Sequence, residues 1–361
     1  MTANTALQLW GITIASPRTI VGAAKRAEQA GMAGLVVTDS QNLAGEVYVA
    51  LAAAAVATDR LRLGTGVTNP VTRHPAVTAA SIAAVQQLSD GRAYLGIGRG
   101  DSALAHLGRA PASVSSLERY VVALQAYLRG EAIPFDDLDF HERLAPPVET
   151  LGLADTPGAS RITWLRDIPK VPIEVVATGP KVIALAALHA DRVLLAVGAD
   201  PERLTWAIEL ARSTRRAAGL DPDAISFGAY VNVLAHRDLP TARRLAAGGL
   251  ATFARFSVMH GTATGPQDDE SRTVLHRLHQ SYDMMHHTRA DSGQAAVLPD
   301  EFIDRYGIVG PPDLCVEKLQ AIHALGIDKV ITVGATAGVS ATDIAEVGRL
   351  FAAEVVPAFA V

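Results

Sequence analysis

Cysteine and charge are both scarce in this sequence. The 361 residues include one cysteine, Cys315, which excludes an intrachain disulfide and a cysteine-based metal cage and favours a reducing, cytoplasmic location. Charged residues make up 19% of the chain and the net charge is −5. This balance gives no electrostatic reason to expect nucleic acid or an anionic membrane surface as a partner. We therefore expect the partner to be a small molecule.

Long uninterrupted apolar runs are also lacking. Glycine, proline, aspartate and arginine break the apolar stretches, so the sequence predicts no membrane span. The first ten residues lack a basic stretch ahead of an apolar core, so it predicts no signal peptide. What the chain does contain is 49% hydrophobic residues, with many alanines, which is enough to bury one large core.

Segments typical of strands and helices alternate along the chain. The predicted strands are nearly continuous apolar runs, as expected of parallel strands covered by helices. They occupy residues 7–14, 34–38, 61–69, 92–98, 172–178, 192–197, 225–234 and 329–333. Eight strands, each followed by a helix, predict an α/β fold, a (β/α)8 TIM barrel forming a single domain over residues 1–361. Two insertions are predicted, at about 131–170 after strand 4 and about 260–309 after strand 7.

Two glycine-rich segments lie where TIM barrels carry their chemistry, at the C-terminal ends of strands. Residues 64–70 (GTGVTNP) place two glycines in the third strand, which indicates a bulge or the close approach of another group. Residues 96–101 (GIGRGD) end the fourth strand and allow backbone to approach a flat ring, without the spacing of a dinucleotide fingerprint. The alternative interpretation of residues 64–70 is a bulge that only shapes the barrel rim. The alternative interpretation of residues 96–101 is that Asp101 only caps a helix.

The end of the fifth strand has a different character. Residues 177–181 (ATGPK) lead into a helix that begins with proline, and a helix N-terminus exposes backbone N–H groups suited to phosphate. Lys181 adds positive charge beside them. The alternative interpretation is an ordinary turn between a strand and a helix.

Histidines are concentrated in the predicted second insertion. If the segment is helical, one face carries His276, His279, Asp283, His286 and His287, with Tyr282 beside them. We favour a substrate-pocket lining for this face, because histidine binds substrates and donates protons near neutral pH. A solvated helix face is the second interpretation and a divalent metal site the third, so we expect no metal.

Taken together, several segments resemble one known family. They are residues 64–70 with 72–75, 88–92 running into 95–101, 177–181, 306–311 and 315–319. In this order and at these barrel positions they resemble the luciferase-like flavin- and deazaflavin-dependent oxidoreductases. The branch they resemble most is similar to F420-dependent methylenetetrahydromethanopterin reductase. The resemblance covers nearly the whole chain apart from the first predicted insertion.

The resemblance implies a barrel, usually homodimeric, that binds coenzyme F420, a deazaflavin, or FMN in sister branches. It implies a cis peptide bond between Gly66 and Val67 that presses a bulge against the ring. The implied cofactor-binding residues are Asp39, Thr65, Gly66, Val67, Asn69, Gly98, Gly100, Asp101, Thr178, Gly179, Pro180 and Lys181. The activity implied is hydride transfer between the deazaflavin and a small organic substrate. The protein then supplies binding and orientation.

Site residues for the substrate follow from placement at the barrel mouth. Asp101 and His260 are the predicted catalytic proton donors, and Tyr282, His286 and His287 are predicted to shape the pocket. An FMN-dependent monooxygenase and a non-catalytic F420-binding protein are the alternatives, with a metal-dependent barrel hydrolase a distant third.

The sequence also departs from the family pattern. Ser40 stands where related sugar-phosphate dehydrogenases have a catalytic histidine, and Leu104 where they have an asparagine. The first strand lacks the glutamate of the methylene-pterin reductase. We therefore expect a substrate of this protein's own.

Overall fold

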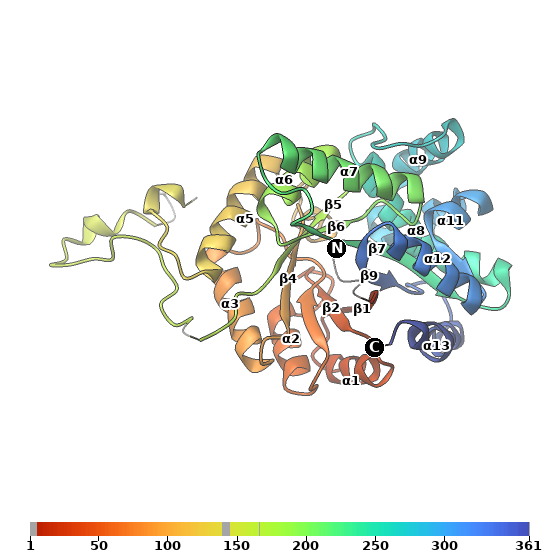
Figure 1. Cartoon of the computed structure of the whole chain (residues 1–361), viewed down its shortest axis with the longest axis horizontal. Coiled ribbons are helices and arrows are strands. Elements are labelled where there is room, and N and C mark those ends of the chain that lie inside the picture. The colour runs from red at the N-terminus through yellow and green to blue at the C-terminus, as the bar shows by residue number, and fades with distance from the viewer. Residues whose placement is uncertain (1–5, 139–144, 166, 361) are drawn as a thin grey trace.

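Parallel strands form the centre of the molecule, seen in a computed structural model that describes residues 6–138, 145–165 and 167–360 (Figure 1). The strands of the barrel are β1 (Gln8–Ile14), β2 (Gly34–Thr38), β3 (Arg62–Thr65), β4 (Ala93–Ile97), β5 (Ile173–Ala177), β6 (Arg192–Leu195), β7 (Ser226–Ala235) and β9 (Ile327–Val333). Neighbours pair in the order β6-β5-β4-β3-β2-β1-β9-β7, and β6 also pairs with β7, which closes the ring. The predicted TIM barrel is therefore confirmed, and the predicted eighth strand is β9.

Helices cover the outside of this barrel. They are α1 (Ile20–Gln29), α2 (Val47–Ala55), α3 (Pro75–Leu88), α5 (Val114–Leu128), α6 (Pro180–His189), α7 (Pro201–Ala217), α12 (Pro312–Ala324) and α13 (Ala341–Leu350). Four of them, α3, α6, α7 and α12, carry proline in the first turn, where its fixed φ suits a helix start and its missing N–H costs nothing. Side chains cap others: Ser113 accepts a hydrogen bond from the amide of Ser116 at the start of α5.

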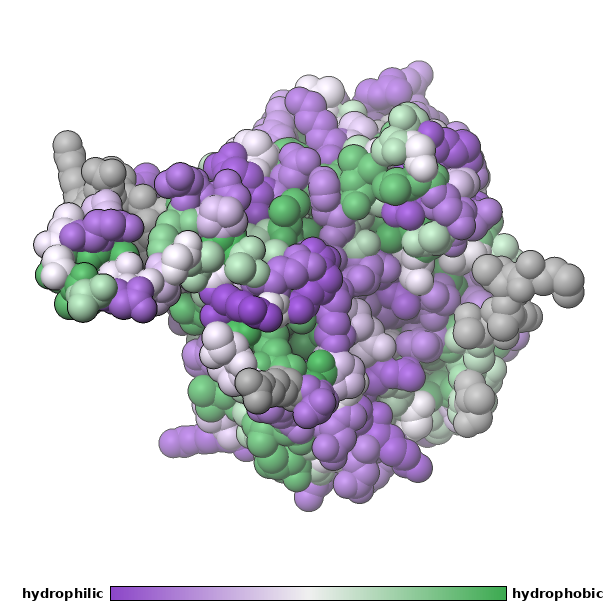
Figure 2. Space-filling model, turned by 60° about the vertical axis from the view of Figure 1, so that its left-hand side comes forward, coloured by the Kyte–Doolittle hydropathy of each residue, from purple (hydrophilic) through white to green (hydrophobic). Residues whose placement is uncertain are grey.

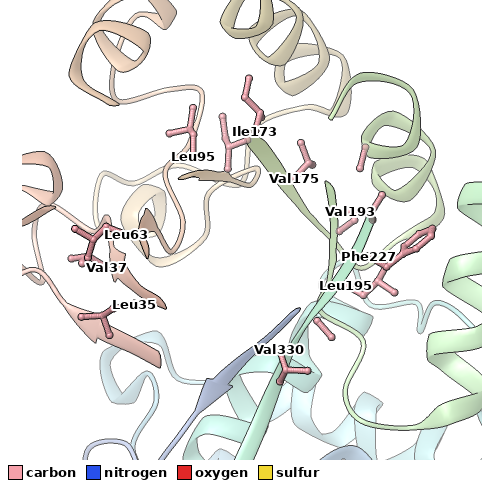
Figure 3. Packing of buried hydrophobic residues seen from close by; sticks show 14 of the residues in the cluster. Leu35, Val37, Leu63, Leu95, Ile173, Val175, Val193, Leu195, Phe227 and Val330 are labelled. Atoms are coloured by element: carbon pink, nitrogen blue, oxygen red, sulfur yellow. The ribbon is translucent and has the colours of Figure 1, made fainter. Parts of the chain in front are cut away.

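The main core lies between the strands and these helices. Successive side chains of a strand point to opposite sides, so Leu35 and Val37 of β2 join the outer core while Val36 between them faces the barrel interior. Figure 3 shows the outer set on several strands, with Leu35, Val37 and Phe227 among the labelled side chains. The interior holds a separate, smaller cluster that includes Trp10 and Tyr230.

A ninth strand lies outside the barrel. β8 (Ile308–Gly310) pairs with residues 233–235, at the end of β7 beyond the part that pairs with β9. The sequence analysis did not predict it. Three residues are too few to show an alternating apolar pattern, and pairing to the overhanging end of β7 is a tertiary effect.

Helices between β7 and β8 form a second hydrophobic cluster. They are α8 (Leu239–Arg255), α9 (Asp269–Ser281), α10 (Gly293–Ala296) and α11 (Asp300–Tyr306). Phe253 near the end of α8 and Phe256 just after it pack on the interior cluster. The end of α8 therefore lies against the barrel. A Cβ on Gly248 of α8 would stand 2.5 Å from the Ala290 nitrogen, so glycine here lets residues 288–290 pack directly on the helix.

The segment between α5 and β5 extends away from the barrel as an arm (Figure 1). Its described residues include two short 3-10 helices, Phe135–Asp137 and Val148–Leu151. The arm leaves large apolar side chains exposed, among them Phe135, Leu151, Leu153 and Trp164. Figure 2 shows it projecting from the body of the molecule with mixed apolar and polar surface.

The domain organisation stays a prediction: a single domain with insertions at about residues 131–170 and 260–309.

Candidate functional site

The peptide bond between Gly66 and Val67 is cis, as the resemblance predicts. It follows β3 at the C-terminal end of the barrel. A Cβ on Gly66 would stand 2.5 Å from Val36 Cγ2 and 3.3 Å from the Tyr230 hydroxyl, so only glycine fits here. The bulge thus rests directly on interior side chains of β2 and β7.

Hydrogen bonds tie this bulge to the neighbouring strand. Thr65 Oγ1 donates to the Gly96 carbonyl at 2.6 Å, and the Thr68 amide donates to the same oxygen at 3.0 Å. The Gly98 amide in turn donates to the Thr68 carbonyl at 3.0 Å. Thr65 and Thr68 are both buried, so these bonds act away from competing water.

Asp39, a predicted cofactor residue, is buried and engaged on both carboxylate oxygens. Thr68 Oγ1 donates to its Oδ2 at 2.7 Å, and Arg73 donates to Oδ2 at 2.6 Å and to Oδ1 at 3.2 Å. The pKa of Arg73 is raised: burial opposes its charge, but the hydrogen bonds and charge of Asp39 prevail. Asp39 and Arg73 therefore fix the bulge through Thr68. The sequence analysis included Arg73 in a motif but assigned it no role.

The fourth-strand glycines make room for the bulge. A Cβ on Gly98 would stand 3.3 Å from Val67 Cγ2, and a Cβ on Gly96 would collide with the Thr65 carbonyl oxygen. Gly100 has φ +83°, a left-handed conformation that favours glycine. Val67 and the loop after β4 therefore lie against each other, and the structure brings these predicted residues together.

Asn69 is buried just beyond the bulge. Its Oδ1 accepts hydrogen bonds from the amides of Val71 at 3.0 Å and Thr72 at 3.1 Å. Its Nδ2 is buried with no hydrogen-bond partner among the described residues. Because an unsatisfied buried donor costs free energy, this amide is suited to an acceptor on a bound molecule.

The N-terminus of α6 is open. Gly179 is the residue before the helix, no side chain caps it, and a Cβ there would meet nothing within 4 Å. Thr178 Oγ1 donates to the Ala196 carbonyl at 3.1 Å, Pro180 begins the helix, and Lys181 is exposed. A free helix N-terminus with a nearby lysine is suited to an anion.

A cluster of polar side chains lies where the end of α8 meets the loop after β4. Arg255 forms an ion pair with Asp101, and its guanidinium lies 4.4 Å over the ring of Tyr282. The Tyr282 hydroxyl is 2.7 Å from His287 Nδ1 and 3.2 Å from Thr252 Oγ1. Of the predicted substrate and catalytic residues, the structure brings Asp101, Tyr282 and His287 together.

Burial dominates the chemistry of His287. It lowers the pKa of the imidazole to about 4, against the charge of Asp101 and in the same direction as Arg255 and His106. His287 is therefore neutral at pH 7. It acts there as a hydrogen-bonding group without positive charge.

The other predicted histidines lie outside this cluster. His286 is exposed and binds Asp283 Oδ2 through Nδ1 at 2.6 Å. His260 is exposed, with Nε2 3.4 Å from Arg99. Among the described residues, no group of three or more histidine, cysteine or acidic side chains is arranged to hold a metal ion.

The predicted helical face of histidines is wrong. α9 ends at Ser281, and Tyr282 is extended, with φ −70° and ψ 118°. Asp283 then caps a separate 3-10 turn by accepting a hydrogen bond from the Met285 amide at 2.8 Å. The side-chain preference of aspartate for a helix start outweighs the helical spacing of the histidines.

Two residues of the polar cluster, Thr252 and Arg255, were missed. One signal was present in the sequence: Arg255 is a charged residue between two phenylalanines in an alanine-rich segment. Arginine in such a setting is rarely buried without a partner.

Of the helices in the described ranges, none is long and apolar enough to cross a bilayer.

Comparison with known proteins identifies a family for this chain. The model of the luciferase-like monooxygenase family matches residues 2–329. The 5,10-methylenetetrahydromethanopterin reductase of Methanolobus tindarius is 27% identical, over 85% of this chain and 87% of that protein. That of Archaeoglobus fulgidus is 29% identical, over 85% and 86%.

A solved structure shows the same fold. The coenzyme F420-dependent tetrahydromethanopterin reductase of Methanopyrus kandleri superposes with a TM-score of 0.72 at 22% identity, over 98% of this chain and 99% of that one. The family match covers the ends of β2, β3, β4 and β5, where the candidate site lies. From the family match and its shared barrel, this chain belongs to the luciferase-like monooxygenase family.

Proposed function

We propose that the protein is an oxidoreductase that binds coenzyme F420 and transfers hydride between this deazaflavin and a small organic substrate. The observation that carries the proposal is the bulge after β3, where Val67 packs against the backbone of Gly98 and the buried Asn69 Nδ2 has no hydrogen-bond partner among the described residues. The names of similar proteins support it: two are methylenetetrahydromethanopterin reductases, and the similar solved structure is described as F420-dependent.

The described residues fit such a cofactor. The flat ring would lie against Val67, where Gly98 and Gly100 leave no side chains in the way. The unpartnered Asn69 Nδ2 offers a hydrogen bond, and the open N-terminus of α6 at Gly179 suits a phosphate. When bound, the deazaflavin supplies the hydride chemistry, and this chain binds, orients and excludes water.

The substrate side differs from the family pattern. Ser40, at the expected histidine position, has its hydroxyl 3.3 Å from that of Ser102. Leu104, at the expected asparagine position, is buried against Gly100, where a Cβ would stand 2.7 Å from Leu104 Cδ1. Both side chains make contacts within or between the loops after β2 and β4. These contacts support a substrate other than the sugar phosphates of the related dehydrogenases.

The predicted proton donors differ in how well their geometry suits the role. Asp101 accepts a hydrogen bond from Arg255, so we propose that it positions Arg255 at the mouth. His260 stays a prediction as a donor on the exposed rim. His286 stays a predicted pocket residue.

A cytoplasmic homodimer is part of the proposal. α2 and α3 contact each other, and both helices carry exposed apolar side chains. The exposed side chains are Val49, Val56, Val77 and Leu88. A second copy would cover this surface, and analytical ultracentrifugation measures the mass directly. A monomer at micromolar concentration would contradict the dimer.

The test of the function is cofactor binding followed by turnover. Purified protein is titrated with F420 and with FMN, and deazaflavin or flavin fluorescence gives each Kd. We expect tight binding of F420 and weak binding of FMN. Tight binding of FMN alone would favour a monooxygenase instead. F420 that binds but is never oxidised or reduced would favour a non-catalytic cofactor-binding protein.

A further inference from the structure

Tyr282 and His287 form a hydrogen-bonded pair at the barrel mouth. The hydroxyl of Tyr282 lies 2.7 Å from His287 Nδ1, and Thr252 Oγ1 lies 3.2 Å from the same hydroxyl. The Arg255 guanidinium covers one face of the phenol ring at 4.4 Å. The phenol is therefore held in place from three sides.

Contacts connect this pair to the proposed ring site. Arg255 bonds Asp101, and Asp101 belongs to the loop after β4 whose Gly98 lies against Val67. His106 follows the short helix Ser102–Ala105 in the same loop, and its charge also lowers the pKa of His287. The pair is thus linked through Arg255 and Asp101 to the loop after β4, which lines the proposed ring site.

Both members of the pair are neutral near pH 7. Burial raises the pKa of Tyr282, although Thr252 and Arg255 oppose it, so the phenol keeps its proton. Burial likewise keeps His287 uncharged, although Asp101 opposes it and Arg255 and His106 reinforce it. An imidazole that carries its proton on Nδ1 donates to the Tyr282 oxygen. Thr252 donates its own proton to the Gly248 carbonyl, so the phenol proton is directed to Thr252 Oγ1 at 3.2 Å, a long contact that a substrate oxygen would replace.

We propose, building on the proposed function, that Tyr282 donates the proton in the reduction of a ketone or aldehyde and that His287 is a positioning residue that replaces this proton. The reduced deazaflavin, when bound, would supply hydride to the carbonyl carbon, and the π electrons would move to oxygen. The Tyr282 O–H bond breaks as the alcohol O–H bond forms. The phenolate takes the Nδ1 proton of His287 while Nε2 takes one from water. The carbonyl is reduced by two electrons and the deazaflavin would be oxidised by two, and the hydroxide left by the water takes the proton that the reduced deazaflavin releases to solvent after losing hydride.

A carbonyl suits this donor better than the other reducible groups. A developing alkoxide is a strong base, so a weak neutral acid such as a phenol is matched to it. An iminium ion takes hydride without a proton. Within this cluster the Asp101 carboxylate is occupied by Arg255, so the phenol rather than the carboxyl group is the acid we assign to the substrate.

The test uses the full chain with reduced F420 and a panel of simple ketones, aldehydes and cyclic imines, followed by the absorbance of oxidised F420. We expect the wild type to reduce carbonyls, and Tyr282→Phe to lower kcat by about 10²–10⁴-fold with F420 binding unchanged. Tyr127→Phe is the matched control, because Tyr127 is also buried and its hydroxyl bonds Ser160, in the segment between α5 and β5. It should keep wild-type kcat.

A second variant and a second readout separate chemistry from structure. His287→Gln should lower kcat more than it changes KM and alter the pH profile. In the protein without cofactor, ¹⁵N NMR of the histidines should show the Nδ1 resonance of His287 shifting in Tyr282→Phe, where the hydrogen bond is lost, and not in Tyr127→Phe.

The outcomes that overturn the inference are distinct. Wild-type kcat in Tyr282→Phe would remove Tyr282 from the role, and an unshifted Nδ1 resonance would remove the pairing. F420 binding without reduction of any carbonyl, or with reduction of imines only, would overturn the carbonyl assignment and leave the cofactor proposal standing. Failure to bind F420 at all would overturn the proposed function itself.

Discussion

Lys329 Nζ donates a hydrogen bond of 2.7 Å to Glu174 Oε2 inside the barrel, with 1% and 2% of the two side chains exposed. The ammonium group also lies 3.3 Å from the ring centroid of Trp10. Arg192 Nε stands 3.1 Å from the other oxygen of Glu174, as an ion-pair contact without hydrogen-bond geometry. The barrel interior below the bulge therefore contains compensated charge as well as apolar side chains.

Breaking this pair should be costly. Lys329→Met leaves the Glu174 carboxylate buried with a weaker partner, so we expect the free energy of unfolding to fall by about 3–5 kcal/mol. The double variant Glu174→Leu, Lys329→Met should recover most of that loss, because neither charge is then buried alone. Urea unfolding measures both. A loss below about 1 kcal/mol in the single variant would mean that water reaches the site.

His287 makes stability depend on pH. Its folded pKa, about 4, lies below the ordinary 6.5, so the unfolded chain binds a proton that the folded chain refuses. The contribution is fully present above pH 6.5 and is lost as pH falls toward 4, by up to about 3 kcal/mol. Urea unfolding from pH 7 to pH 4 of the wild type and of His287→Gln isolates it. The variant should show the shallower decline. Parallel curves would contradict the buried, neutral imidazole.

Gly66 should tolerate no side chain. In Gly66→Ala the new Cβ would collide with Val36, so we expect destabilisation by about 1–3 kcal/mol and weaker F420 binding. Gly348→Ala in α13 is the control, because a Cβ there meets nothing within 4 Å. That variant should be more stable by about 0.5–1 kcal/mol with F420 binding unchanged. Equal behaviour of the two variants would argue against close packing under the bulge.

Asn69 offers a subtler change. Asn69→Asp keeps the oxygen that accepts from Val71 and Thr72 and replaces only the unpartnered amide nitrogen. If that nitrogen donates to the cofactor, F420 affinity should fall about tenfold or more, equivalent to about 1.4 kcal/mol, because a donor becomes an acceptor. Fluorescence titration gives the Kd, and unfolding midpoints show whether the loop remains intact. Unchanged affinity would place the nitrogen away from the cofactor.

Local patterns in the sequence predicted the fold and the positions of two features of the candidate cofactor site. Strand and helix periodicity gave eight strands and their order. The family pattern around Gly66 located the cis bond, and the proline after Gly179 located the open helix start. Each of these features is encoded within a few consecutive residues. That is why one sequence suffices for them.

Long-range partners could not be predicted in the same way. Asp39 and Arg73 are 34 positions apart, Asp101 and Arg255 154, and Glu174 and Lys329 155. Only the closed barrel and the path of α8 bring them together. The stop of α9 at Ser281 was missed for the opposite reason, because a regular helical spacing continued past the local signal of Asp283.

A crystal structure of the protein soaked with F420 would locate the cofactor directly. We expect the deazaflavin ring against Val67, Asn69 Nδ2 within hydrogen-bond distance of it, and the phosphate at the N-terminus of α6 beside Gly179. A ring bound elsewhere, or FMN in this place while F420 fails to bind at saturating concentration, would contradict the proposed F420 site.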